Sequence, residues 1–366
     1  MARTLLRRAA LLFILADLLA AGALFALPHE REAGLLLWQL ARGEVPALAA
    51  IPSRWPEGEG DLYVPPGGAR AGLLLVPGAA ETGKDDPRLV IFARALADHG
   101  FLVLVPDLAG PRSLRVGSAD IGDIAAAARH LLSLPHGAGP VGIAAISYGV
   151  GPALLAALEP DLRSRIGFFI SLGGYYDATS VLTFFTTGYW RPAPGAPWQL
   201  GRPNRYGKWV FVLANAVRLD SAPDRERLER IARAKLADLD ADTSGLERAL
   251  GPEGRAVMAL LDNRDPARVP RLIADLPARI QAEIAALDLS TKDLAPLRAQ
   301  VLLIHGRDDA IVPYSESVAL AKALGPRAHL FLLDRLPHAT LRAEDIPDAC
   351  RLWRAAALLF AWRDGD

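Results

Sequence analysis

The sequence predicts an α/β protein with a mostly parallel, doubly wound sheet and an inserted helical cap. Short, continuously apolar runs of strand length alternate with amphipathic stretches of helical period in both halves of the chain. This alternation is typical of a parallel sheet whose two faces are covered by helices. It stops between residues 183 and 290, where no buried strand is predicted, and then resumes. With 366 residues, 51% of them hydrophobic, the chain can bury a large core.

Residues 1–28 predict a segment that inserts into a membrane. Arg3, Arg7 and Arg8 precede a run from 9 to 27 that is apolar except for Asp17. We favour an uncleaved anchor over a cleaved signal peptide or a buried helix, because the run is longer than a usual signal sequence. The basic residues in front of it predict that the globular part lies outside the cytoplasm, and cleavage would give a secreted protein instead.

Residues 29–60 are expected to connect this segment to the globular part. The apolar stretch at 35–40, which includes Trp38, is expected either to lie along a membrane surface or to form a short helix packed on the domain. The prolines and glycines between Pro52 and Gly60 predict a linker or turn.

The first part of the core is expected at residues 61–182. Its apolar runs predict buried strands, and helices with one apolar face are expected to lie between them. The expected strands are 73–76, 101–105, 141–146 and 166–172, and the expected helices are 87–99 and 121–134.

An inserted helical cap is expected at residues 183–290, followed by the second part of the core at 291–366. Such an insertion is expected to lie over the carboxyl ends of the strands, where open α/β sheets bind ligands. An aromatic and proline-rich piece at 184–198 precedes helices expected at 208–219, 223–239, 254–261 and 269–287. In the second core part, strands are expected at 301–306 and 329–333, and helices at 315–324 and 346–362.

Ser147 is the first candidate for chemistry. It follows the apolar run 141–146, has the small residues Ala145 and Gly149 two positions to either side, and precedes an alanine- and leucine-rich helix. This pattern predicts a sharp strand–serine–helix turn with a strained serine and a helix N-terminus beside it. A glycine is usual where Ala145 stands, and an incidental serine in an ordinary turn is the alternative.

A base and an acid for this serine occur near the C-terminus. Asp308 and Asp309 lie in the turn after the predicted strand 301–306, and His338 lies in the turn after the last predicted strand. A serine hydroxyl needs both partners to become a nucleophile. Because the carboxyl ends of parallel strands share one edge of the sheet, Ser147 and His338 are expected to meet one of these carboxylates there.

With these motifs, the chain resembles the α/β-hydrolase superfamily over residues 61–182 and from 290 to the C-terminus. The order serine, acid, histidine matches that family. Its turn of the type His-Gly-x-x-Asp-x-x-Val-Pro matches residues 305–313 and implies that Asp309, rather than Asp308, is the acid. The resemblance implies a serine hydrolase of the carboxylesterase or lipase kind, with no cofactor or metal, acting on a small-molecule or lipid acyl substrate through an acyl-enzyme. A carboxylic ester is the default substrate, and thioesters, amides and lipid esters are the alternatives.

The resemblance also implies an oxyanion hole with two backbone donors. One is the N–H of Tyr148, directly after the nucleophile. The other comes from the turn after the strand 73–76, and we expect the amide of Ala79, with Ala80 as the alternative. Pro77 departs from the histidine that is common at its position in the family.

Two alternatives come from the sequence. Residues 78–84 match the phosphate-binding pattern G-x-x-x-x-G-K, but Asp85 occupies the position that needs a hydroxyl, so nucleotide hydrolysis is disfavoured. The second alternative is a non-catalytic scaffold of the same fold, which binds a partner or lipid at the membrane through its cap. With 41 basic and 41 acidic residues, the charge gives no reason to expect a nucleic-acid partner, and the single cysteine, Cys350, excludes an internal disulfide.

Overall fold

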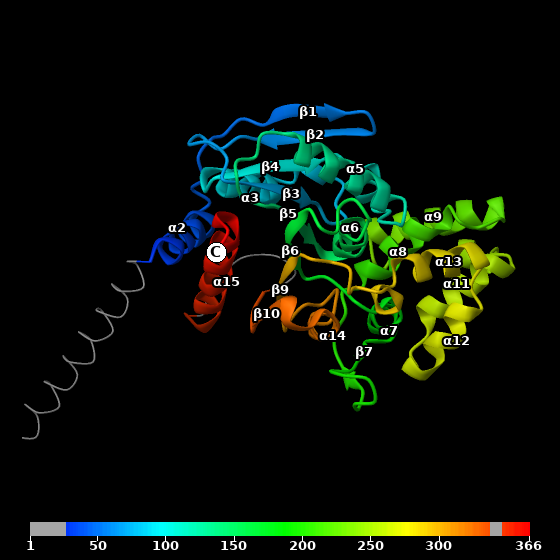
Figure 1. The fold of residues 1–366 in the computed structure, drawn as a ribbon. Helices are drawn as coiled ribbons and strands as arrows, with labels where there is room; N and C mark the ends of the chain where they lie inside the picture. Colours follow the sequence, from blue (N-terminus) through cyan, green and yellow to red (C-terminus); the bar gives the residue numbers. More distant parts are fainter. Residues whose placement is uncertain (1–26, 337–345) are drawn as a thin grey trace, which may run out of the picture.

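A computed structural model describes residues 27–336 and 346–366. Its main sheet has eight strands in the order β1-β2-β4-β3-β5-β6-β9-β10 (Figure 1). The strands from β4 to β10 are parallel to one another, whereas β1 and β2 pair in antiparallel fashion at one edge. The strands are β1 (Ile51–Trp55), β2 (Gly58–Tyr63), β3 (Ala71–Val76), β4 (Phe101–Pro106), β5 (Val141–Ile146), β6 (Ile166–Leu172), β9 (Gln300–Gly306) and β10 (Ala328–Leu333).

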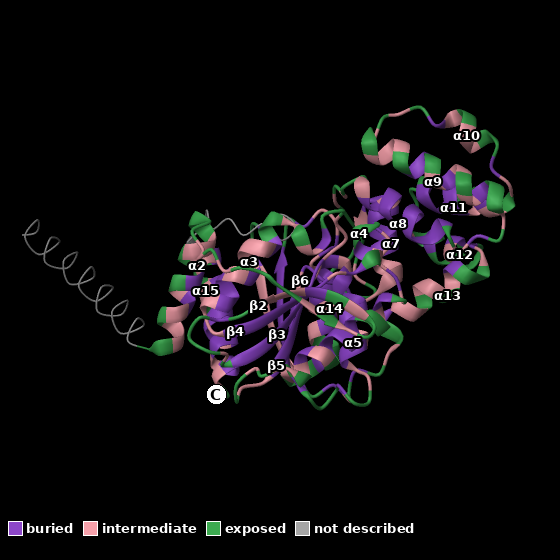
Figure 2. Ribbon diagram, turned by 90° about the horizontal axis from the view of Figure 1, so that it is seen from above, coloured by how far each residue is buried: buried purple, intermediate pink, exposed green. Residues whose placement is uncertain are grey.

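Helices cover both faces of this sheet, and its central strands β4, β3, β5, β6 and β9 are mostly buried (Figure 2). Within β3, Leu74 and Val76 belong to one hydrophobic core and Leu73 and Leu75 to the other, because successive side chains point to opposite faces. One core includes α5 (Asp120–Ser133), α6 (Val150–Ala157) and α14 (Ser315–Leu324), and the other α2 (Pro28–Arg42), α3 (Pro87–Asp98) and α15 (Ile346–Asp364). The predicted doubly wound α/β fold is confirmed.

The chain leaves the sheet after β6 and forms a helical cap before it returns at β9. The cap projects from one side of the sheet in Figure 1 and has a third hydrophobic core of its own. Its elements are α7 (Ala178–Thr187), β7 (Tyr189–Trp190), β8 (Gln199–Leu200), α8 (Tyr206–Ala216), α9 (Ala222–Ala237), α10 (Ser244–Arg248), α11 (Pro252–Asp262), α12 (Val269–Ala274) and α13 (Ala278–Leu287).

The sequence prediction for the cap needs two corrections. The stretch expected as one helix at 269–287 forms two, because Pro277 lacks the N–H that a continuing helix needs. The aromatic piece expected at 184–198 begins inside α7, where Phe184 and Phe185 are buried. Farther along it contains β7, which pairs with β8 just beyond the piece.

The segment 29–60 is more than a connector. Residues 52–60, expected as a linker or turn, form most of the β1–β2 pair, and only positions 56 and 57 make the turn. Helix α2 packs against α15 through Ala33 and Leu36, and the fully buried Arg363 of α15 pairs with Glu32. Trp38 lies on the other face of α2 and is 61% exposed.

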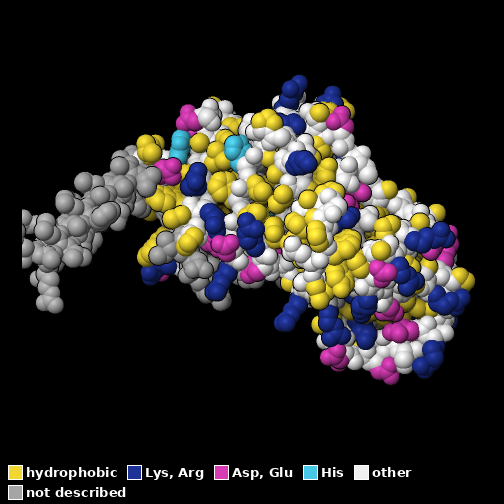
Figure 3. All heavy atoms as spheres, turned by 90° about the horizontal axis from the view of Figure 1, so that it is seen from below, with side chains coloured by type: hydrophobic (Ala, Val, Ile, Leu, Met, Phe, Trp, Pro, Cys, Tyr) yellow, Lys and Arg dark blue, Asp and Glu magenta, His cyan; other side chains and the backbone are white. Residues whose placement is uncertain are grey.

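The face of the molecule in Figure 3 has hydrophobic side chains over its middle and a mixture of basic and acidic side chains toward the cap. The predicted membrane segment, residues 9–27, lies almost wholly outside the described residues. Among the helices that are described, none has both the length and the apolar character that crossing a bilayer requires.

Candidate active site

Ser147 lies at a sharp turn between β5 and α6. It opens the short 3₁₀ helix Ser147–Gly149, its backbone has a φ of 55°, and 4% of the residue is exposed. A positive φ is rare for a residue with a side chain and costs about 1–3 kcal/mol, so the surrounding packing must enforce it. Such strained residues cluster at functional sites. Among the described residues other than glycine, only Leu114 shares a positive φ with Ser147.

The small neighbours of Ser147 have a packing role. A β-carbon at Gly149 would lie 2.8 Å from the carbonyl oxygen of Pro77, which is closer than real side chains approach a backbone oxygen. Ala145, where the family pattern has glycine, is fully buried in the sheet. The turn therefore accepts one methyl group before the serine but none after it.

The ends of four neighbouring strands meet beside Ser147. Ala145 of β5 pairs with Val76 of β3, and Ile146 pairs with Leu172 of β6, which in turn pairs with Ile304 of β9. The turns that follow these strands therefore open at one edge of the sheet. Gly78, in the turn after β3, lies so close that a β-carbon on it would be 3.6 Å from the β-carbon of Ser147.

The two amides considered for the second oxyanion donor differ in their hydrogen bonding. The N–H of Ala80 donates to the carbonyl of Pro111 at 3.2 Å. The N–H of Ala79 has no hydrogen-bond acceptor among the described residues, and Ala79 lines the same groove as Ser147 and Tyr148. Ala79 is thus the amide that remains available to a ligand.

Asp309 is held rigidly in the turn after β9. It is 7% exposed, and its Oδ1 accepts hydrogen bonds from the N–H groups of Ile311 at 2.7 Å and Val312 at 3.0 Å. Its Oδ2 lies 3.5 Å from Nε2 of the buried His305. That imidazole nitrogen donates to the carbonyl of Val312, and Nδ1 forms a hydrogen bond with the Ser317 hydroxyl, so His305 has a structural role.

Asp308 has a different position from its neighbour. It is exposed, and its Oδ1 accepts a hydrogen bond from the N–H of Leu336 at 2.9 Å. Gly306 permits this contact, since a β-carbon there would lie 2.3 Å from the carbonyl oxygen of Leu336. The sequence did not indicate this bond, which fixes the chain two residues before His338. His338 itself lies outside the described residues.

A groove with a volume of about 370 Å³ contains Ser147 and Asp309, and we call it the serine groove. Apolar side chains from α2, α3 and α15 line its far part. Leu336 and Tyr148 line it as well, and burial followed by the negative charge of Asp309 raises the pKa of the Tyr148 hydroxyl. Ser147 and Asp309 therefore share one largely apolar space.

The glycine- and lysine-containing stretch 78–84 does not form a phosphate-binding loop. Lys84 Nζ donates to Asp61 at 2.9 Å and to Asp85 at 3.0 Å, so two carboxylates already hold its charge. The next α-helix begins only at Pro87. Among residues 27–336 and 346–366, no group of three or more His, Cys, Asp or Glu side chains is arranged to hold a metal ion.

Comparison with solved structures identifies the class of fold: the chain has the α/β-hydrolase fold. A protein of Legionella pneumophila, described provisionally as a hydrolase, matches with a TM-score of 0.57 and 13% identity over 92% of this chain and 96% of its own. A meta-cleavage product hydrolase from Pseudomonas fluorescens matches at 0.42 and 19% identity, covering 83% and 94% of the two chains. A serine hydrolase from Cycloclasticus zankles matches at 0.46 and 15% identity, covering 87% and 100%. No protein-family model and no curated protein sequence matches the chain.

Proposed function

We propose that this chain is a serine hydrolase that cleaves a carboxylic ester through Ser147, His338 and Asp309. The strained backbone of Ser147 is the observation that carries the proposal. It occurs at the carboxyl edge of a parallel sheet, next to an amide for which the described part of the chain supplies no acceptor, and in the same groove as a buried carboxylate. A structural serine needs none of these features.

The described residues also support His338 as the base. Leu336 lines the serine groove and is fixed by Asp308. Two residues of extended chain span at most about 7 Å, which is the greatest distance that the chain can cover between Leu336 and position 338. Asp309, with Oδ1 held by two backbone amides, is suited to orient an imidazole through its second oxygen.

The reaction follows from these roles. Ser147 Oγ attacks the acyl carbon while His338 takes the hydroxyl proton, and the carbonyl oxygen becomes an oxyanion near the N–H groups of Tyr148 and Ala79. The ester bond breaks when His338 passes the proton to the leaving alcohol. Water, deprotonated by the same imidazole, then attacks the acyl-enzyme and releases the carboxylic acid and Ser147.

Hydrolysis of a panel of 4-nitrophenyl esters tests this function. We expect wild-type turnover, and a loss of about 10⁴-fold or more in kcat for Ser147→Ala and His338→Ala. Ser133→Ala, at an exposed serine that ends α5, is the matched control and should keep wild-type kinetics. A folded wild-type chain without activity toward any acyl ester would favour the non-catalytic scaffold instead.

We further propose that residues 9–27 anchor the chain in a membrane with its globular part outside the cytoplasm. The outer face of α2, which follows directly, exposes Leu35 and Trp38. Such side chains suit the interface between lipid and water. Fractionation after an alkaline carbonate wash tests the anchor: the full chain should stay with the membranes, and recovery in the wash would contradict the proposal.

A further inference from the structure

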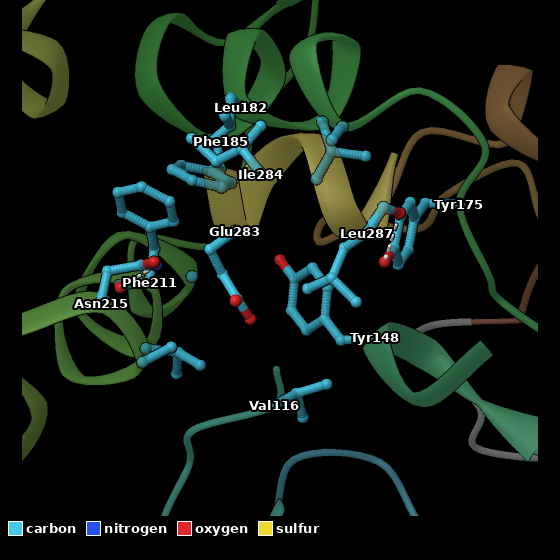
Figure 4. A pocket seen from close by; sticks show the side chains of 15 residues that line it. Val116, Tyr148, Tyr175, Leu182, Phe185, Phe211, Asn215, Glu283, Ile284 and Leu287 are labelled. Carbon is cyan, nitrogen blue, oxygen red and sulfur yellow. Dashed lines mark hydrogen bonds between the residues drawn. The ribbon is translucent and has the colours of Figure 1, made fainter. Parts of the chain in front are cut away.

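A second cavity lies between the cap and the turn that contains Ser147, and we call it the cap pocket. It has a volume of about 110 Å³. Helices α7, α8 and α13 supply most of its walls, and Val116, Tyr148 and Tyr175 complete it from the core side (Figure 4). Most of the lining side chains are apolar, among them Leu182, Phe185, Phe211, Ile284 and Leu287.

The cap pocket adjoins the serine groove at Tyr148. Tyr148, Gly207 and Val210 line both spaces, so the Tyr148 ring stands between them. A β-carbon at Gly207 would lie 3.5 Å from the Tyr148 hydroxyl, which shows how closely α8 approaches the ring. Tyr148 directly follows Ser147. A substrate that attaches one group in the cap pocket therefore needs only a short linker between that group and the carbonyl carbon that Ser147 attacks.

Two buried polar atoms of this lining have no hydrogen-bond partner among the described residues. They are the hydroxyl of Tyr148 and the side-chain carbonyl oxygen of Asn215, whose amide group donates to the carbonyl of Phe211. Buried polar atoms are nearly always satisfied, and leaving them unpaired is costly. Burial and then the charge of Asp309 raise the pKa of Tyr148, so its hydroxyl stays protonated at neutral pH.

The remaining polar groups of the pocket are already engaged. Figure 4 shows the Glu283 side chain extending into the pocket, and its carboxylate accepts hydrogen bonds from the N–H and the hydroxyl of Ser118 and pairs with Arg218 at 2.6 Å. The Tyr175 hydroxyl donates to the carbonyl of Leu287 at 3.2 Å. The pocket therefore offers an occupant one free acceptor, on Asn215, and one free hydroxyl, on Tyr148.

The volume limits the size of the occupant. An apolar protein cavity of about 150 Å³ holds one benzene molecule, so the smaller cap pocket has room for at most a single ring or a short branched chain, and not for a long acyl chain. An occupant that is wholly apolar would leave Asn215 and Tyr148 unpaired. An occupant with a charged group would have no counter-ion, because Glu283 and Arg218 already neutralise each other.

We propose that the cap pocket binds a compact apolar group that carries one hydroxyl, with a hydroxylated aromatic ring as the best fit. The hydroxyl donates to the side-chain oxygen of Asn215, and the Tyr148 hydroxyl is the second polar group of the lining that the occupant can meet. We infer from this pocket that the substrates are esters in which such a group lies on one side of the scissile bond. This inference rests on the proposed function.

Binding of p-cresol and toluene to the full chain, measured by calorimetry, tests the pocket without catalysis. We expect p-cresol to bind about tenfold more tightly than toluene, which is the value of one hydrogen bond. Asn215→Leu should abolish most of this preference, and Gly207→Val, which narrows the pocket, should weaken both ligands. Val217→Ala, at an exposed residue that ends α8, should leave both affinities unchanged.

Equal affinities for the two compounds, absence of binding, or an unchanged preference in Asn215→Leu would overturn the proposal. If Asn215→Leu does not fold, Tyr148→Phe is the second test variant. It should also reduce the preference for p-cresol over toluene. In kinetics, the 4-nitrophenyl ester of 4-hydroxyphenylacetic acid should exceed that of phenylacetic acid in kcat/KM by a similar factor. Turnover of both esters at the same rate contradicts only the proposal for the cap pocket. Binding of p-cresol without turnover of any ester contradicts only the proposed hydrolase function.

Discussion

Asp308 accepts a hydrogen bond from the backbone of Leu336, and this bond joins the turn after β9 to the turn after β10. Its neighbour Asp309 instead turns toward the protein interior, where two backbone amides hold one of its oxygens. Adjacent carboxylates therefore have separate roles: Asp308 positions the chain that leads to His338, and Asp309 is the acid proposed to orient the imidazole.

This division predicts different effects of substituting the two residues. Asp309→Asn keeps the shape but removes the charge that stabilises an imidazolium, so kcat for a chromogenic ester should fall by about 10³–10⁴-fold. Asp308→Ala frees the Leu336 amide and should lower kcat by about tenfold, together with a lower melting temperature. Steady-state kinetics and thermal unfolding measure both, and a greater loss of kcat in Asp308→Ala would reverse the assignment.

The contact between Gly149 and Pro77 predicts a second effect. In Gly149→Ala the new methyl group would meet the Pro77 carbonyl at 2.8 Å, and the backbone that carries Ala79 would have to move. Since one oxyanion donor contributes about 10²–10³-fold to rate, we expect kcat to fall at least tenfold while KM changes little. An alanine variant with wild-type kcat would show that the turn after β3 does not supply a donor.

Glu316 predicts a dependence of stability on pH. Burial, and after it the nearby charge of Asp177, raises the pKa of Glu316 to about 7, although the N–H groups of Tyr176 and Asp177 bond to its carboxylate. The folded chain therefore binds a proton more readily than the unfolded chain, in which the pKa is near 4.5. The stability from this group is present below pH 4.5 and is lost as the pH rises toward 7.

Glu316→Gln tests this dependence because an amide oxygen can accept the same two bonds without a charge. The melting temperature of the variant minus that of the wild type should be larger at pH 8 than at pH 5. A variant that loses more stability at pH 8 than at pH 5 would mean that the buried carboxylate is stabilised as an anion.

The sequence predicted those parts of the fold that rest on local signals. Strands β5 and β6 and helix α14 begin and end where expected, because continuous apolar runs and amphipathic periods are properties of short windows. The β1–β2 pair was missed: its proline and glycines resemble a linker, and only pairing with β4 makes it part of the sheet. The break between α12 and α13 differs from the single helix predicted at 269–287, although Pro277 is a local signal for it.

In the site, too, the features with a local sequence signal were predicted, and those that depend on contacts between distant segments were not. Ser147 followed from its flanking residues and its place after an apolar strand, and the structure adds the strained φ. The bond between Asp308 and Leu336 and the unpaired atoms of Tyr148 and Asn215 depend on contacts between distant segments. No pattern within one segment encodes them, which is why the cap pocket appears only in three dimensions.

The central claim is that Ser147 is a reactive nucleophile. Labelling of the folded full-length chain with a fluorophosphonate, read by mass spectrometry, tests it most directly. We expect one adduct per chain, located on Ser147, and none in Ser147→Ala under the same conditions. Equal labelling of both proteins, or an unlabelled wild type whose fold is intact, would contradict the claim.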